Sequence, residues 1–211
     1  MQRLEQIADQ IRDQMEQTNT ARDLTYQRSR ELTRVCARAI RAVHREEWEL
    51  ARELMDEARA AAGAMIAGVR EFPALYYAGY TQDALKEYVE ANLTYLIVRD
   101  EPLLAPAELA VEDNTWLNGL AEAATELRRR ILDILRGGHE QEVERLLDTM
   151  DEIYSVLVTF DFSDSITGGL RRRTDVLRSV LERTRGDVTT SLRQTELERA
   201  LESLEKKLAG Q

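Results

Sequence analysis

The sequence has few of the residues that build disulfides and the commoner metal sites. Of its 211 residues, one is a cysteine and two are histidines. The single Cys36 excludes an intramolecular disulfide and a zinc site made of cysteines. His44 and His139 lie far apart in the sequence, which argues against a histidine-built metal site. Any chemistry must therefore come from carboxylates, arginines and hydroxyl groups.

Helix-breaking residues and long apolar runs are also scarce. The chain has three prolines and ten glycines, with 43% apolar and 32% charged residues. This composition is typical of a helical protein, and the length allows a sizeable core. No apolar run approaches the roughly 20 residues of a membrane-spanning helix. Because the first residues (MQRLE) include no apolar signal segment, we expect a cytoplasmic protein that does not interact with membranes.

Apolar residues recur with helical spacing along the whole chain, and no strand pattern or sequence repeat interrupts them. We therefore predict a single all-α domain over residues 1–211, built as a bundle of six or seven helices. The first helix is expected either as one piece or as two pieces joined near Thr18–Thr20. Pro102 and Pro106 mark a loop, Arg136-Gly137-Gly138 ends one helix, and Gly168-Gly169 forms a turn. The predicted helices span residues 3–44, 46–70, 74–98, 112–135, 139–160 and 170–208.

The net charge of −10 argues against nucleic acid as a partner, but a global sum can hide a local basic patch. Steps of 4, 4, 3 and 4 residues place five arginines on one face of the first predicted helix. This face could simply be solvated and paired with acids of neighbouring helices. It could also bind a phosphate backbone, because guanidinium groups suit phosphate oxygens. The arginine ridge consists of Arg30, Arg34, Arg38, Arg41 and Arg45.

Acidic residues occupy one narrow face of the helix predicted at 74–98. Asp83, Glu87 and Glu90 stack on that face, whereas more than half of the circumference is apolar. Such a helix should be largely buried. Buried carboxylates are costly unless they are paired, hydrogen-bonded or bound to a metal ion.

A second pair, Glu122 and Glu126, lies four residues apart on the helix predicted at 112–135. If this helix packs antiparallel to the one at 74–98, both pairs can converge into an acid cluster of Glu87, Glu90, Glu122 and Glu126. Oxygen ligands of this kind suit Mg²⁺ or Mn²⁺, which assist phosphodiester cleavage. The alternative is that glutamate is a common helix former and that these spacings arise by chance.

Four segments, in the right order along the chain, carry a resemblance to the translin/Trax family. Residues 85–91 (LKEYVEA) resemble the QEYVEA-type stretch of Trax, the nuclease partner of translin. Residues 116–129 are similar to the helix that follows it, which reads roughly YLLGVADLTGELMR. Residues 29–32 (SREL) together with 38–45 (RAIRAVHR) are similar to the basic first helix of the family. Residues 170–178 (LRRRTDVLR) resemble the LRKRYDGL-type start of its last helix.

The resemblance implies a seven-helix fold that assembles into a hollow, nucleic-acid-binding octamer. It also implies that this protein is a prokaryotic homologue whose octamer is built from identical chains. It also implies a metal-dependent ribonuclease site facing the interior. Glu87 and Glu90 fall on the two catalytic glutamates of the Trax stretch, and Glu126 falls on the family's glutamate four residues after position 122. Glu122 stands where the family has an aspartate. Its side chain is one methylene longer, which could shift the metal ion and alter the rate and the metal preference.

Three functions remain open at this point. The first is a metal-dependent endoribonuclease that binds single-stranded or weakly paired RNA with the arginine ridge and cuts it at the acid cluster. The second is a binding-only oligomer, as translin is, that holds RNA or single-stranded DNA. In that case its acids would pair with Arg128, Arg129 or Arg130. The third is an assembly protein with no nucleic-acid partner, which the net negative charge favours.

Overall fold

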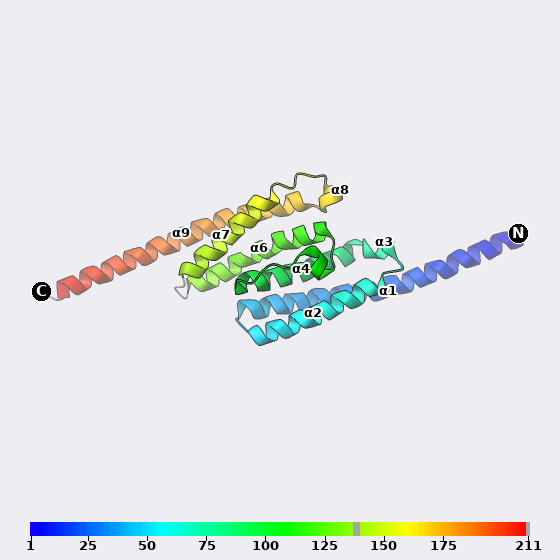
Figure 1. Cartoon of the computed structure of the whole chain (residues 1–211), viewed down its shortest axis with the longest axis horizontal. Helices are drawn as coiled ribbons and strands as arrows, with labels where there is room; N and C mark the ends of the chain where they lie inside the picture. The colour runs from blue at the N-terminus through cyan, green and yellow to red at the C-terminus, as the bar shows by residue number, and fades with distance from the viewer. Residues whose placement is uncertain (137–139, 210–211) are drawn as a thin grey trace. The chain divides into compact units, whose positions relative to one another are not determined.

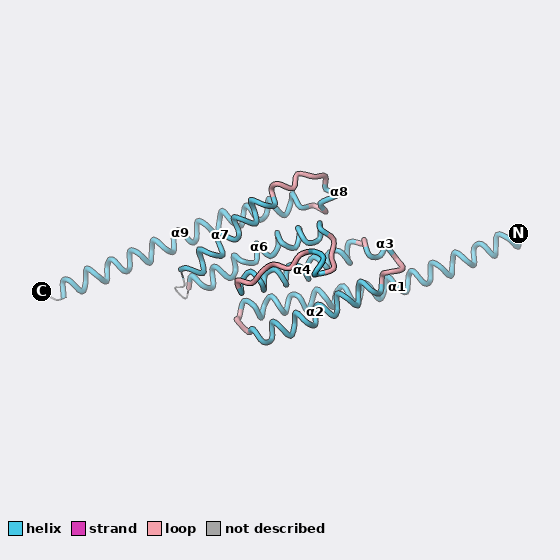
Figure 2. Tube along the Cα trace, in the orientation of Figure 1, coloured by secondary structure: helices cyan, strands magenta, loops and turns pink. Residues whose placement is uncertain are grey.

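Helices account for all of the regular structure in residues 1–136 and 140–209, the part of the chain that the computed structural model describes (Figures 1 and 2). The prediction of an all-α protein is confirmed. Three of the helices are only four residues long: α3 (Pro73–Tyr76), α5 (Pro106–Leu109) and α8 (Asp164–Thr167). The longer ones are α1 (Gln2–His44), α2 (Trp48–Gly68), α4 (Gly79–Arg99), α6 (Asp113–Leu135), α7 (Glu140–Leu157) and α9 (Leu170–Ala209).

Helix α1 is continuous through the join considered at Thr18–Thr20. The hydroxyl groups of Thr18 and Thr20 donate to the backbone oxygens of Gln14 and Glu16, both at 2.9 Å. These side chains therefore bond back within the helix and do not open it.

The helix predicted at 74–98 is divided in two. Ala78 is extended, with ψ of 142°, and separates α3 from α4. Two side chains of α4 hold the break by bonding to carbonyl groups of α3. The Thr81 hydroxyl donates to the Leu75 oxygen at 2.7 Å, and the Gln82 amide donates to the Tyr76 oxygen at 2.8 Å.

The chain forms two compact units, Met1–Gly119 and Leu120–Gln211, and the boundary lies inside helix α6. The single domain predicted over residues 1–211 stays a prediction. The glycine turn predicted at Gly137-Gly138 and the start of the next helix at His139 lie outside the described residues.

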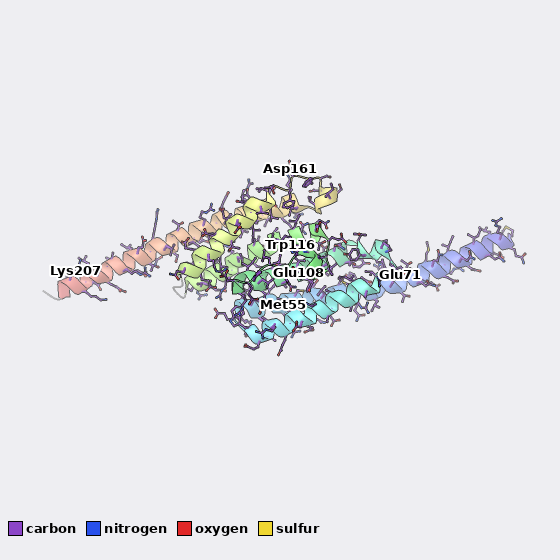
Figure 3. The ribbon with its side chains drawn as sticks, in the orientation of Figure 1. Met55, Glu71, Glu108, Trp116, Asp161 and Lys207 are labelled. Carbon is purple, nitrogen blue, oxygen red and sulfur yellow. The ribbon has the colours of Figure 1, made fainter. Side chains whose placement is uncertain are left out.

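The first unit is built around α1, α2 and α4. The apolar stripe expected on α1 is buried there, with Leu32, Cys36, Ala39 and Val43 fully enclosed. The connection between α4 and α6 is tied down by side chains. The Glu108 carboxylate accepts from the Ala105 N–H at 2.7 Å, and the indole N–H of Trp116 donates to the Leu104 oxygen at 2.9 Å. Glu108 and Trp116 are labelled in Figure 3.

The second unit packs α7 against α9. Gly168 and Gly169 adopt φ values of 62° and 83°, which glycine reaches without strain, and they form the predicted turn before α9. The far half of α9 exposes a stripe of leucines. The exposed leucines are Leu197, Leu201, Leu204 and Leu208.

None of the described helices is long and apolar enough to cross a membrane.

Candidate metal and nucleic-acid sites

Helix α4 is enclosed on nearly all sides. Thirteen of its 21 residues are buried, so its polar residues cannot all reach water. Lys86, Glu90 and Asn92 are among the buried residues, and the Asn92 amide donates to the Tyr88 backbone oxygen at 2.7 Å. The burial predicted for this helix is confirmed. Its charged residues must therefore be stabilised by other charges or by a bound ion.

Glu87 and Glu90 are brought together on α4. A carboxylate oxygen of each lies within 4.8 Å of one from the other. Glu90 is only 9% exposed, whereas the Glu87 side chain is 30% exposed. The Lys86 ammonium donates to the Glu87 carboxylate at 3.1 Å, a contact that the sequence did not suggest. Asp83, expected on the same face, is exposed to solvent.

The buried thiol of Cys36 in α1 is affected by the charges of these two acids. Burial, and to a lesser extent the negative charges of Glu87 and Glu90, raise the pKa of its thiol. The folded state therefore keeps the thiol protonated where the unfolded chain would form the reactive thiolate. The effect of this thiol on the free energy of unfolding is therefore most favourable below the unfolded pKa of about 8.5. The free energy of unfolding falls as pH rises from there towards the folded pKa, because the unfolded chain releases the proton first.

We expect native Cys36 to react with a thiol-directed disulfide reagent at pH 8 at least about 100-fold more slowly than in denaturant, because reaction requires local opening. The measurement is the rate of thionitrobenzoate release with and without 6 M urea, with Cys36→Ala as the blank. Equal rates in the two solvents would contradict the enclosed position of the thiol.

Gly119 marks a close approach of α6 to α4. A Cβ atom built at Gly119 would lie 2.6 Å from the Cβ atom of Val89 and 3.0 Å from the Lys86 backbone oxygen. The glycine therefore lets the two helix backbones meet beside the segment that carries Glu87 and Glu90. Only a glycine allows this distance. An isolated glycine inside a helical pattern was the sequence signal that could have predicted this close approach of α6 to α4.

Glu122 and Glu126 follow Gly119 by three and seven residues in the same unbroken helix. At 3.6 residues per turn they lie one and two turns beyond Gly119, on nearly the same side of α6. Both are half-buried. The face of α6 that meets α4 at Gly119 therefore continues into these two carboxylates.

Within the second unit, Glu122 accepts a hydrogen bond from Arg173 Nε at 2.9 Å. Arg173 lies 51 positions further along the chain, near the start of α9, and sequence reasoning missed it. The arginines considered as partners of the acid cluster also bind other residues. Arg128 donates to Asp187 at 2.8 Å, and Arg130 donates to Glu142 at 2.9 Å.

The arginine ridge is exposed along α1, as the periodicity predicted. Arg34 approaches Glu31 at 3.3 Å, and Arg38 approaches Glu57 of α2 at 3.9 Å. These pairs are solvent-exposed and contribute little to stability. No other member of the ridge forms an ion pair within the described residues. Most of the ridge is thus available to an anionic ligand.

Comparisons with known proteins place this chain among relatives of similar length. No family model matches the sequence. It is 30% identical over 182 residues to the uncharacterised protein MJ0175 of Methanocaldococcus jannaschii, covering 84% of this chain and 79% of that protein. Among solved structures it is similar to AfC3PO in two structures, one of which is a complex with duplex RNA. In both, identity is 30%, the TM-score is 0.81, and 87% of this chain is covered.

The match covers 95% of the AfC3PO chain in the RNA complex and 96% in the other structure. The structure of apo-NeC3PO is similar in fold, with a TM-score of 0.80 at 19% identity. That match covers 87% of this chain and 96% of the NeC3PO chain.

Proposed function

The chain belongs to the translin family, and on this basis we propose that it is a metal-dependent endoribonuclease acting on single-stranded or weakly paired RNA. The family assignment confirms the resemblance found in segments such as residues 85–91. The observation that carries the proposal is the pair of carboxylates, Glu87 and Glu90, held within 4.8 Å of each other on an enclosed helix. The duplex RNA bound by AfC3PO supports RNA as the ligand class.

The donor set fits a hard divalent cation. Carboxylate oxygens are the ligands that Mg²⁺ and Mn²⁺ prefer. We propose that Glu87, Glu90, Glu122 and Glu126 hold the ion, since α6 carries the last two on the side that meets α4 at Gly119. A divalent ion bound there would supply a Lewis acid for phosphodiester hydrolysis. Lys86 and Arg173 would position the carboxylates of Glu87 and Glu122, to which they donate hydrogen bonds.

A labelled single-stranded RNA incubated with the purified protein tests the proposal. Cleavage in Mg²⁺ or Mn²⁺ that stops with chelator is the expected result. A duplex RNA, run in parallel, shows whether pairing prevents cleavage. Cleavage that chelator leaves unchanged would overturn the role of the metal ion.

The second candidate is a binding-only oligomer that holds RNA or single-stranded DNA. The ion pairs of Glu87 with Lys86 and of Glu122 with Arg173 favour it, because a carboxylate satisfied by a cationic side chain needs no metal ion. RNA binding without cleavage under every metal condition would establish this reading.

The arginine ridge is proposed to bind the RNA backbone. For a single strand, the logarithm of affinity should fall with the logarithm of salt by about 0.7 for each phosphate contact. Replacing Arg34 and Arg41 by glutamine should therefore reduce that slope by about 1.4. Filter binding between 50 and 300 mM salt measures it.

The matched control for the ridge is the double variant Arg3→Gln/Arg22→Gln, which removes the same charge from exposed positions on other sides of α1. Its slope should equal that of the wild type. An equal loss of slope in both variants would mean that total charge, and not the ridge, governs binding. Absence of any salt-dependent binding would favour an assembly protein with no nucleic-acid partner.

The oligomer is proposed to be an octamer of identical chains. The exposed leucine stripe on α9, which includes Leu197 and Leu204, is an unpartnered apolar surface that supports self-association. Light scattering after size exclusion should give eight times the 24.2 kDa mass of the chain. A monomer would contradict this part of the proposal.

A further inference from the structure

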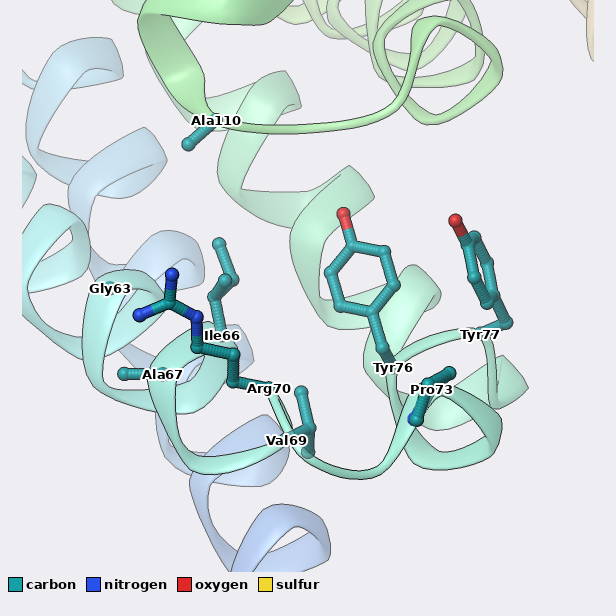
Figure 4. Close-up of a pocket in the computed structure, with 9 residues that line it drawn as sticks. All are labelled: Gly63, Ile66, Ala67, Val69, Arg70, Pro73, Tyr76, Tyr77 and Ala110. Atoms are coloured by element: carbon teal, nitrogen blue, oxygen red, sulfur yellow. The ribbon is translucent and has the colours of Figure 1, made fainter.

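A hollow of about 510 Å³ opens between the end of α2, helix α3 and Ala110 (Figure 4). All of its walls belong to the first unit. Its volume lies within the usual range for small-ligand sites, about 300–1,000 Å³. Neither the acid cluster nor the arginine ridge contributes a side chain to it.

One wall of the hollow is aromatic. The rings of Tyr76 and Tyr77 meet edge to face, with centroids 4.9 Å apart, and Tyr77 is 64% exposed. The Tyr76 hydroxyl is fixed by a hydrogen bond to the Glu112 carboxylate at 3.0 Å. Burial and this carboxylate raise the pKa of Tyr76 to about 12, so the phenol stays neutral at physiological pH. The wall therefore offers an ordered ring surface, with the Glu112 carboxylate held at its edge by the Tyr76 hydroxyl.

Arg70 supplies a cation to the same hollow. Figure 4 shows the Arg70 and Tyr76 side chains on either side of Ile66. Arg70 is exposed and forms no ion pair within the described part of the chain. The remaining lining is mainly small or apolar, and it includes Gly63 and Ala67. A guanidinium without an ion pair and two aromatic rings that line the same apolar hollow suit a ligand that joins a flat ring to a phosphate.

The hollow lies on a different side of α2 from the ridge. Arg38 of the ridge approaches Glu57, and Arg28 of α1 donates to the Ala64 backbone oxygen at 2.8 Å. These contacts mark the side of α2 that faces α1. By helical periodicity, Gly63 and Ile66 point elsewhere. A ligand in the hollow would therefore not compete with one bound to the ridge.

We propose that this hollow binds one nucleotide, with its base against the rings of Tyr76 and Tyr77 and its phosphate on Arg70. The nucleotide can be a free mononucleotide or an unstacked residue of an RNA strand, because both present the same ring and phosphate. The inference goes beyond the nuclease proposal, since a free mononucleotide would bind here whether or not the protein cleaves RNA.

Titration calorimetry of the full chain with AMP, adenosine and inorganic phosphate tests the chemistry. Tyr77→Ala should weaken AMP and adenosine binding by about tenfold or more, through lost stacking. Arg70→Gln should weaken AMP binding by a similar factor and leave adenosine binding unchanged. AMP binding that neither substitution changes would overturn the proposal.

Filling the hollow provides a second test with a well-folded variant. Gly63 lines the hollow and a Cβ atom there meets no atom within 4 Å, so Gly63→Leu should extend its side chain into the hollow, and it removes a helix-destabilising glycine. This variant should lose AMP binding. The matched control is Gly186→Leu in α9, where a Cβ atom is equally unobstructed, and it should bind AMP as the wild type does. Equal AMP affinity in the two variants would overturn the proposal.

An RNA arm distinguishes the two sources of the nucleotide. A single-stranded RNA with one 2-aminopurine reports base unstacking by its fluorescence. If Tyr77→Ala and Gly63→Leu change both this signal and AMP affinity, the site takes a residue of the strand. If they change AMP affinity alone, it takes the free mononucleotide. If nothing but the oligomer mass changes in Gly63→Leu, the hollow is a subunit contact and the proposal is wrong.

Discussion

Replacing Glu87 and Glu90 together by glutamine should lower RNA cleavage by at least about 1,000-fold while RNA binding is retained. Glutamine keeps the size and shape of each side chain, so α4 should remain packed. It removes two negative charges that lie within 4.8 Å of each other and with them the proposed ligands of the metal ion. The measurements are single-turnover cleavage and filter binding with the same labelled RNA.

Metal binding gives a readout of this variant that does not depend on cleavage. A cation that binds only the folded state raises the unfolding temperature in proportion to the logarithm of its concentration once the site is saturated. Mn²⁺ should therefore stabilise the wild type and not the double variant. Cleavage that survives in the variant would show that the site lies elsewhere, or that the activity belongs to a contaminant.

The matched control is Glu49→Gln/Glu53→Gln, which removes two exposed charges from one side of α2. It should cleave RNA and respond to Mn²⁺ as the wild type does. A loss of cleavage in this control would mean that total charge, and not the pair on α4, determines activity.

Gly119→Ala should lower the free energy of unfolding by about 1–3 kcal/mol, the usual cost of overpacking. Alanine is the better helix former by about 1 kcal/mol, so the loss would be larger without that gain. The added methyl group would lie 2.6 Å from both Cβ and Cγ1 of Val89, a fully buried and stiff β-branched side chain. It would also lie 3.0 Å from the Lys86 backbone oxygen, which cannot move without bending α4.

Gly63→Ala is the internal comparison for this prediction. Because an added Cβ atom has no neighbour within 4 Å there, this substitution should raise the free energy of unfolding by about 0.5–1 kcal/mol. Urea denaturation of the two variants beside the wild type measures both effects. Equal stabilities for the two variants would contradict the close approach of α6 to α4.

Cleavage should also fall in Gly119→Ala, because Glu122 lies one helical turn beyond the displaced residue. A shift of about 1 Å at a reacting group can cost about 100-fold in rate. The single-turnover assay used for Glu87 and Glu90 measures this loss.

The sequence by itself determined the features that depend on local periodicity. Steps of three and four residues predicted the exposed arginine ridge and the buried side of α1 that carries Leu32 and Cys36. The same rule predicted that Glu87 and Glu90 share a face of an enclosed helix. Each of these follows from 3.6 residues per turn, which requires no knowledge of what packs against the helix.

Only the tertiary structure decided which residues meet across helices. The bond between Glu122 and Arg173 spans 51 positions, and the contact of Gly119 with Val89 depends on how closely two helices approach. The hollow is lined by residues of α2 and α3 and by Ala110, which lies more than 30 positions further along the chain. Helical periodicity gives the direction of each side chain but not its partner. Partners are set by packing, which minimises voids and unsatisfied polar groups over the whole unit.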